Sequence, residues 1–327
     1  VDHRGFALND TEVTNWNHCA VLDGESRFVA LTGCSIKCDA DAYVNSLSNG
    51  GWGVRIGGSD GRTVVFAQAN DMFNRRGWSS LSTDIAISYQ SCLRVHQENF
   101  DDNRANIQRN VLEAASPLSI GNANGVDKAH NTIVEGNDFV SNYQARDVVV
   151  LSAGGASVRS NKFLIPRDEG GEDAGSPNGF LRFYNGGGDA VNEDQPIRVY
   201  GNAFVNRRDR LSAVTTIVNS GSYTDVTQNN NINHQPDCTG AVTTYAPLAD
   251  DTDQYTLIEV GYESSTADFK STTATVTSPA GFADRYDPEA GSSAISGATT
   301  GLVPYRDQRG VVRTDVRATP SIGHLEG

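Results

Sequence analysis

Thr132-Ile-Val-Glu-Gly-Asn-Asp-Phe139 is the clearest copy of a pattern that recurs along the chain, for example in Ser157-Val-Arg-Ser-Asn-Lys-Phe163. With the asparagine as position zero, a small apolar residue lies three positions before it and a large apolar residue two positions after it. The same frame fits Ile197-Arg-Val-Tyr-Gly-Asn-Ala-Phe204, Val64-Val-Phe-Ala-Gln-Ala-Asn-Asp-Met72 and Ile107-Gln-Arg-Asn-Val-Leu112. The chain therefore contains one structural repeat used many times.

Three weaker copies extend the series when the asparagine is not required: Leu31-Thr-Gly-Cys-Ser-Ile36, Ile87-Ser-Tyr-Gln-Ser-Cys92 and Val226-Thr-Gln-Asn-Asn-Asn231. The position-zero residues are then Cys34, Asn70, Gln90, Asn110, Asn137, Asn161, Asn202 and Asn229. Their spacings rise from a minimum near twenty residues, as expected when loops of different length are inserted into a coil of constant size. Periods of about 20 to 50 residues indicate solenoids or propellers.

The repeat predicts an all-β fold, a right-handed parallel β-helix (solenoid) with a C-terminal cap. Short segments rich in Val, Thr, Asn and Gly favour strands over helices, and an inward asparagine at a bend can bond the backbone of neighbouring coils. A β-propeller is the alternative, but it requires a more constant period of about 40 to 50 residues. We expect residues 1–245 to form the helix and residues 246–327 to form terminal strands and the cap of the same domain.

Two columns of core residues follow from the frame. The first contains the residues three before position zero, and the second contains those two after it. The first column is Ala67, Ile87, Ile107, Val134, Val158 and Val199, and the second is Met72, Cys92, Leu112, Phe139, Phe163 and Phe204.

Composition excludes some classes of protein. The net charge is −14, with 4 Lys among the 26 basic residues, and no basic stripe suited to nucleic acid is present. No run approaches the ~18 consecutive apolar residues of a membrane helix, so no membrane insertion is expected. The absence of a visible signal peptide suggests a mature or trimmed chain. An acidic, lysine-poor surface suits a halophilic source or an ordinary acidic secreted protein.

The five cysteines lack the spacing of a zinc site. Cys34 and Cys92 occupy inward positions of the frame, which favours small buried side chains. A disulfide between Cys19 and Cys38 is the alternative use of two others.

The Gly-Asn-Asp-Phe, Ser-Asn-Lys-Phe and Gly-Asn-Ala-Phe motifs resemble those of the pectate-lyase-like superfamily of right-handed β-helix proteins. The segment Asp307-Gln-Arg-Gly-Val-Val-Arg313 with Ile322-Gly-His-Leu-Glu326 is similar to a closing motif of secreted bacterial and archaeal β-helix proteins. The superfamily includes polysaccharide lyases, glycoside hydrolases and viral tailspikes. The resemblance implies an extracellular, cell-surface or virion protein whose partner is a polysaccharide or surface glycan.

Catalysis would use outward positions, because the repeat itself is structural. The coils of Asn137, Asn161 and Asn202 carry a concentration of charged and aromatic residues at such positions, and strands of neighbouring coils lie ~4.8 Å apart. The predicted catalytic residues are Lys162, Arg159, Arg198 and Tyr200. The predicted substrate-binding residues are Arg182, Tyr184, Arg76 and His96, and Glu135 and Asp138 are the candidate ligands of a Ca²⁺ ion.

This set suits β-elimination from an acidic polysaccharide. Arginine or Ca²⁺ neutralises the sugar carboxylate, Lys or Arg removes the α-proton, and Tyr or His protonates the leaving oxygen. The simplest alternative is a ladder of exposed ion pairs between neighbouring coils, in which Glu135 faces Arg159 and Asp138 faces Lys162, worth ~0 to 1 kcal/mol each. His96 can equally be a surface histidine on a strand.

Two further functions stay open. Hydrolysis needs two carboxylates ~5 to 9.5 Å apart, for which Asp101 and Asp102, with Glu98 nearby, are the first candidates and the acids of the 166–177 insertion the second. A glycan-binding tailspike, adhesin or surface protein without catalysis is the non-enzymatic alternative, and a homotrimer would favour it.

Overall fold

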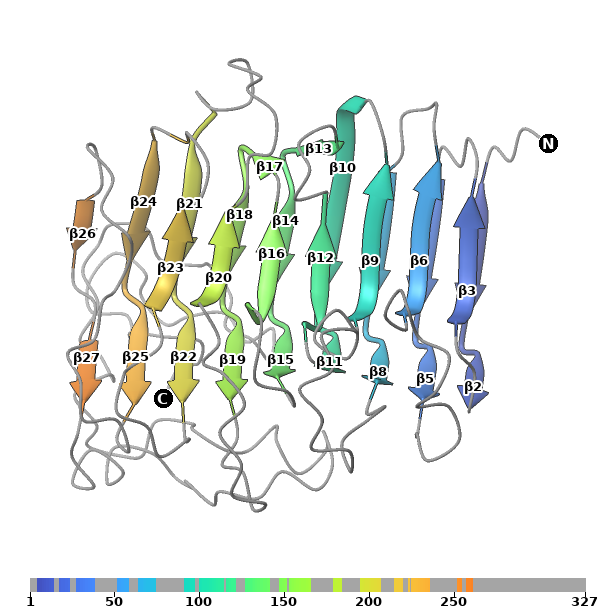
Figure 1. The fold of residues 1–327 in the computed structure, drawn as a ribbon, viewed down its shortest axis with the longest axis horizontal. Coiled ribbons are helices and arrows are strands. Elements are labelled where there is room, and N and C mark those ends of the chain that lie inside the picture. Colours follow the sequence, from blue (N-terminus) through green and yellow to red (C-terminus); the bar gives the residue numbers. More distant parts are fainter. Residues whose placement is uncertain are drawn as a thin grey trace, which may run out of the picture.

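A computed structural model of the protein describes residues 5–14, 18–23, 28–38, 52–58, 64–74, 91–97, 100–114, 116–121, 127–141, 147–151, 153–165, 179–183, 195–206, 215–219, 223, 225–235, 252–254 and 257–260. All regular elements in these residues are β-strands, arranged in three parallel sheets (Figure 1). This confirms the predicted fold class, because the arrangement is consistent with a right-handed parallel β-helix. The predicted cap lies outside the described residues.

Sheet A runs along the whole solenoid and contains eleven described strands. Its main path is β1 (Phe6–Asn9), β4 (Phe28–Thr32), β7 (Val64–Gln68), β10 (Phe100–Gln108), β14 (Ile133–Glu135), β18 (Ser157–Arg159), β21 (Ile197–Tyr200), β24 (Val226–Asn229) and β26 (Thr252–Gln254). Two short strands lie off this path, where β10 pairs with β13 (Asp127–His130) and β13 pairs with β17 (Ala153–Gly154).

Sheet B follows sheet A around the bend at each asparagine. Its nine described strands are β2 (Glu12–Thr14), β5 (Ser35–Cys38), β8 (Asp71–Asn74), β11 (Val111–Ala114), β15 (Asp138–Ser141), β19 (Lys162–Ile165), β22 (Ala203–Asn206), β25 (Ile232–Gln235) and β27 (Leu257–Val260). Sheet C completes the coil with β3 (His18–Asp23), β6 (Trp52–Gly58), β9 (Ser91–Gln97), β12 (Leu118–Ile120), β16 (Val149–Leu151), β20 (Gly179–Phe183) and β23 (Thr215–Asn219).

The asparagines form a continuous hydrogen-bonded ladder at the bend between sheets A and B. The Oδ1 of Asn110 accepts from the backbone nitrogen of Asn70 at 3.0 Å and from its Nδ2 at 2.8 Å, and the Nδ2 of Asn110 donates to the oxygen of Ala67 at 3.0 Å. The same bonds repeat at Asn137, Asn161, Asn202 and Asn231. Each side chain therefore holds two neighbouring coils in register.

Cys34 takes the place of an asparagine in this ladder. Its backbone nitrogen donates to Asn70 Oδ1 at 2.9 Å, and its thiol donates to the oxygen of Leu8 at 3.2 Å. The predicted burial of Cys34 and Cys92 is confirmed, and both are free thiols. Cys19 and Cys38, the candidate disulfide partners, have no described side chains.

The residue before each ladder position adopts a left-handed backbone conformation, with φ between 52° and 69° from Gly33 to Asn230. Glycine fills this position in three of the coils, whereas Ala69, Arg109, Ser160 and Asn230 fill it in the others. An L-residue other than glycine is strained there because its Cβ approaches the following carbonyl oxygen. The sharp turn that sends the chain from sheet A to sheet B thus carries strain in several coils.

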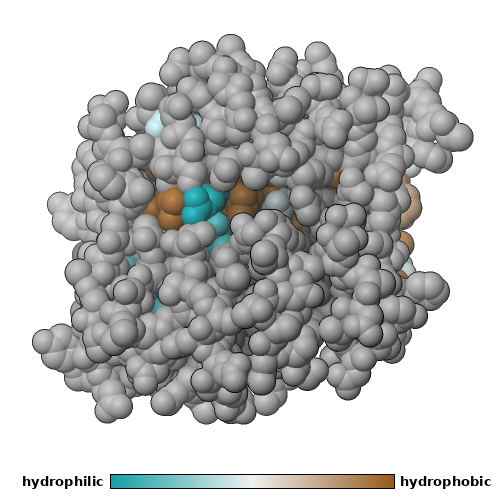
Figure 2. Space-filling view, in the orientation of Figure 1, coloured by the Kyte–Doolittle hydropathy of each residue, from teal (hydrophilic) through white to brown (hydrophobic). Residues whose placement is uncertain are grey.

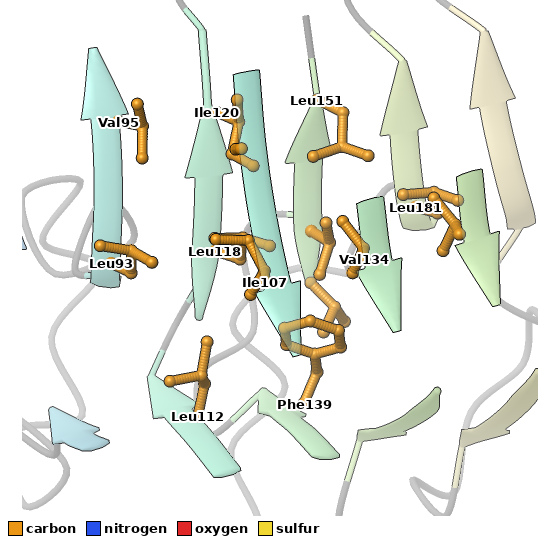
Figure 3. Packing of buried hydrophobic residues seen from close by; sticks show 14 of the residues in the cluster. Leu93, Val95, Ile107, Leu112, Leu118, Ile120, Val134, Phe139, Leu151 and Leu181 are labelled. Atoms are coloured by element: carbon orange, nitrogen blue, oxygen red, sulfur yellow. The ribbon is translucent and has the colours of Figure 1, made fainter. Parts of the chain in front are cut away.

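Inward side chains of all three sheets meet in one hydrophobic core (Figure 3). The register confirms most of both predicted columns: Ala67, Ile107, Val134, Val158 and Val199 are successive partners in sheet A, and Met72, Leu112, Phe139, Phe163 and Phe204 are successive partners in sheet B. Ile87 lies outside the described residues. The Phe163 ring lies 5.1 Å from that of Phe139 and 4.7 Å from that of Phe204.

The prediction that Cys92 belongs to the second core column is wrong, and Gln90, the predicted ladder residue of that coil, lies outside the described residues. β7 pairs directly with β10 and β8 with β11, whereas Cys92 lies in β9 of sheet C. Asn70 and Asn110 are thus successive ladder positions, 40 residues apart. The physical reason is that alternating apolar residues mark a strand with one buried face, and this pattern is the same in every sheet.

The ladder position between β24 and β25 is Asn231 and not Asn229 as predicted. The Oδ1 of Asn231 accepts from the backbone nitrogen of Asn202 at 2.9 Å, and the inward residue three before it is Gln228. The frame requires an apolar residue three positions before the ladder residue, and it missed this register because the core is polar in this coil. There Asn233 takes the position of Phe204 and donates to Thr216 Oγ1 at 2.6 Å.

Candidate functional site

The structure distributes the predicted site residues over three different sheets. Glu135, Arg159, Arg198 and Tyr200 lie on sheet A, Asp138 and Lys162 lie on sheet B, and His96 and Arg182 lie on sheet C. Tyr184 and Arg76 lie outside the described residues, and the His96 side chain is not described. The group that comes together is therefore the one on sheet A.

Four polar residues in successive coils form a row on the outer face of sheet A, here called the outer row: Gln108, Glu135, Arg159 and Tyr200. Gln108 Nε2 donates to Glu135 Oε2 at 3.4 Å, and Arg159 Nη2 donates to the same oxygen at 3.0 Å. Arg159 Nη1 donates to Tyr200 Oη at 3.1 Å. The outer row is thus one hydrogen-bonded chain running along the solenoid.

Arg159 is the centre of the outer row. Burial lowers its pKa, but the hydrogen bonds to Glu135 and Tyr200 outweigh this effect and hold the pKa above the ordinary value of arginine. The side chain of Arg159 is 30% exposed and that of Glu135 is 22% exposed. The Nε of Arg159 is buried without a hydrogen-bond partner. Arg159 is therefore a cation whose guanidinium is partly exposed, which suits an anion-binding role.

Arg198 lies on the same face, one coil beyond Ser157 in the register. Its Nη1 donates to Asp225 Oδ1 at 2.7 Å and its Nη2 to Asp225 Oδ2 at 3.1 Å, in the two-pronged geometry typical of arginine and a carboxylate. The hydrogen bond from Arg198 lowers the pKa of Asp225. Nη1 also donates to Thr227 Oγ1 at 3.3 Å.

Asp138 and Lys162 face each other on neighbouring strands of sheet B, as the frame predicted, with Nζ 4.0 Å from Oδ1. The expectation that this pair is exposed is wrong, because Lys162 is fully buried and Asp138 is nearly so. Lys162 therefore cannot reach a polysaccharide in this structure. Its replacement by Ala is expected to affect the fold, since removing one partner of a buried ion pair leaves an uncompensated charge.

Arg182 lies on sheet C and contacts Asp147, whose Oδ2 accepts from its Nε at 2.6 Å. The backbone oxygen of Asp147 accepts a hydrogen bond from Ser116 Oγ at 2.9 Å. In the orientation of Figure 1, the described residues visible from outside form a short band in which hydrophobic residues lie on both sides of a hydrophilic group (Figure 2). Arg182 is thus bound to Asp147 of the neighbouring coil, on a different sheet from the outer row.

The candidate Ca²⁺ ligands, Glu135 and Asp138, lie on different sheets. Glu135 lies on sheet A with Arg159 and Gln108 as partners, whereas Asp138 lies beyond the Asn137 bend and faces Lys162. Each carboxylate is already paired with a cation. Within the described ranges, no group of three His, Cys, Asp or Glu side chains is placed to hold a metal ion.

Two acidic residues were missed by the sequence reasoning: Asp225 and Asp147. Asp225 precedes β24, and the correct register of that strand, counted from Asn231, places Thr227 beside Arg198 and so brings Asp225 near. Asp147 lies just before β16 and carries no repeat signal. The candidate hydrolytic acids Asp101 and Asp102 lie in β10 without described side chains, and Glu98 and residues 166–177 lie outside the described residues.

No protein-family model matches the chain, and no curated protein matches it. None of the described residues forms a helix of the length and apolarity that a membrane span requires. The candidate site therefore has to be interpreted from its own geometry.

Proposed function

We propose that this chain is an extracellular β-helix protein of the pectate-lyase-like superfamily that binds an acidic polysaccharide along the outer row of sheet A. The observation that supports this is the hydrogen-bonded sequence of Gln108, Glu135, Arg159 and Tyr200 in successive coils, of which the first three are partly exposed and Tyr200 is nearly buried. The sequence resemblance and the parallel β-helix support the superfamily. A cell surface or a virion is the proposed location.

The geometry suits a linear, charged glycan. Strands of successive coils are ~4.8 Å apart, so the row offers an amide, a carboxylate, a guanidinium and a phenol at regular intervals along the axis. Sugar hydroxyls can exchange hydrogen bonds with the first two, and a sugar carboxylate can accept from the remaining N–H groups of Arg159. Because Glu135 neutralises part of this charge, binding is expected to be selective rather than purely electrostatic.

Cleavage by β-elimination is the second candidate, favoured by the 3.1 Å contact between Arg159 and Tyr200 Oη. In this reaction a base removes the proton next to the sugar carboxylate, a carbon–carbon double bond forms, and the glycosidic C–O bond breaks as its oxygen gains a proton. Arg159 would neutralise the carboxylate and Tyr200 would protonate the leaving oxygen. Lys162, predicted as a base, is buried and Tyr200 is nearly so, so the described row favours binding over cleavage. Hydrolysis and a Ca²⁺ requirement stay predictions.

The test is binding of alginate, pectate and chondroitin, with a neutral polysaccharide as the control ligand. We expect the wild type to bind at least one acidic chain, Arg159→Ala to weaken this at least tenfold, and Lys37→Ala, an exposed change on sheet B, to leave it unaltered. Equal binding by Arg159→Ala and the wild type would overturn the proposal.

Ultraviolet absorbance of an unsaturated product that disappears in Tyr200→Phe would establish β-elimination. New reducing ends without this absorbance would indicate hydrolysis. Mass measurement in solution tests the homotrimer.

A further inference from the structure

The coil formed by β20, β21 and β22 has an apolar residue from each of the three sheets in its interior. These residues are Phe180 of sheet C, Val199 of sheet A and Phe204 of sheet B, and all three are fully buried. The rings of Phe180 and Phe204 pack against each other with their centroids 5.6 Å apart. Aromatic side chains therefore join sheets B and C across the core of this coil.

The next coil, formed by β23, β24 and β25, has polar residues at the corresponding positions. Asn233 follows Phe204 in the register of sheet B, and Thr216 lies between the register partners of the two residues that flank Phe180 in sheet C. Gln228 is the inward residue of sheet A, and all three polar side chains are at most 1% exposed. Asparagine and threonine are smaller than the two phenylalanines, so side chains fill less of the interior in this layer.

The three polar residues have more hydrogen-bonding groups than the described chain satisfies. Both polar atoms of the Gln228 amide, Oε1 and Nε2, are buried without a hydrogen-bond partner. Asn233 Oδ1 accepts from Gln235 Nε2 at 3.0 Å, and Asn233 Nδ2 donates to Thr216 Oγ1 at 2.6 Å. This leaves the second N–H of Asn233 and the hydroxyl hydrogen of Thr216 without an acceptor among the described residues. Each sheet thus brings an unmet polar group into the same layer.

We propose that this layer is an internal water site, in which ordered water joins Gln228 to Asn233 and Thr216. Buried polar groups in folded proteins are satisfied by the chain or by ordered water, because an unpaired buried amide raises the free energy of the folded state. Water both donates and accepts, so it can serve the carbonyl and the N–H groups of one amide together with a hydroxyl. A buried water typically bonds to about two to four polar groups, and this layer offers such groups from all three sheets. Water then makes the contact across the core that the aromatic pair makes in the coil before.

Nuclear magnetic resonance of the full chain detects this water directly. The ¹⁵N-labelled side-chain amide of Gln228, assigned through its bonded carbons, is expected to show a cross-relaxation peak at the water frequency. A rotating-frame experiment separates this peak from proton exchange. Asn161 is the matched control, since its side chain is equally buried and its Nδ2 donates to both the Val134 oxygen and Asn202 Oδ1. No water peak at Gln228, or an equal peak at Asn161, would overturn the proposal.

Gln228→Met tests the same site through stability. Methionine keeps the length of the side chain and removes both polar atoms, so it breaks the bonds to water and leaves Asn233 and Thr216 without their bridge. We expect the urea midpoint to fall. An amide that has no water partner gives the opposite result, because its removal relieves an unsatisfied buried group; a higher or unchanged midpoint would therefore refute the water site. Gln68→Met, at a partly exposed position on the outer face of sheet A, is the control and should leave the midpoint unchanged.

Discussion

Replacing Asn110 by Ala tests the asparagine ladder as the device that holds the coils in register. Asn110 is almost fully buried, and its side chain forms bonds in both directions along the solenoid. The change removes the acceptor of the Asn70 backbone nitrogen, which is Asn110 Oδ1, and the donor to the Ala67 backbone oxygen, which is Asn110 Nδ2. Asn70 Nδ2 still donates a hydrogen bond to the backbone oxygen of Leu31, and Asn137 Oδ1 still accepts one from the backbone nitrogen of residue 110.

The expected magnitude follows from these two buried groups. Each backbone group that loses a hydrogen bond in the interior costs about 1–3 kcal/mol, so we expect the loss of two to lower the free energy of unfolding by about 2–6 kcal/mol. Asn110→Cys should cost less, about 2 kcal/mol, because Cys34 shows that a thiol can supply the donor at this position. Urea denaturation followed by circular dichroism measures both changes.

Asn106 is the matched control, since it is the same residue type in the same strand. It points outward, is partly exposed, and its Oδ1 is buried without a hydrogen-bond partner. Asn106→Ala should therefore change the free energy of unfolding by less than about 1 kcal/mol. If Asn110→Ala costs no more than Asn106→Ala, the ladder does not stabilise the stack and the reasoning is wrong.

Three further changes follow from the described geometry. Ala69→Gly should raise the melting temperature and add about 1 kcal/mol to the free energy of unfolding, because Ala69 has a φ of 55° that glycine adopts without strain; an unchanged melting temperature would contradict the strain. Phe163→Ala should cost about 3–5 kcal/mol through a cavity between the two neighbouring rings, as measured by calorimetry. Asp225→Asn should cost less than about 1 kcal/mol at neutral pH, since the pair with Arg198 is exposed. Because the pKa of Asp225 is lowered in the folded state, its contribution is present above about pH 4, the ordinary pKa of Asp, and is lost as the pH falls through the lowered value. Unfolding curves of the two proteins should therefore converge in acid, and a constant difference would argue against this assignment.

The candidate site shows how far prediction from the sequence can go. The pairings Glu135 with Arg159 and Asp138 with Lys162 were predicted from the register alone, and both are present. The register cannot show that the two pairs lie on different sheets with different exposure, because that depends on what packs against each sheet. His96 and Arg182, two of the predicted substrate-binding residues, lie on sheet C, whereas Arg159 lies on sheet A.

The sequence alone determined the repeat, the all-β class, the inward position of the asparagines and most of both core columns, because period-two burial and a polar bend are local properties of a few residues. It misassigned Cys92 and Asn229, since identical strand patterns occur in all three sheets and since a polar core residue such as Gln228 breaks the apolar rule. Only the tertiary structure decided which outward residues meet solvent. That depends on contacts between segments far apart in the chain, which is why Arg159 is accessible while Lys162 is buried.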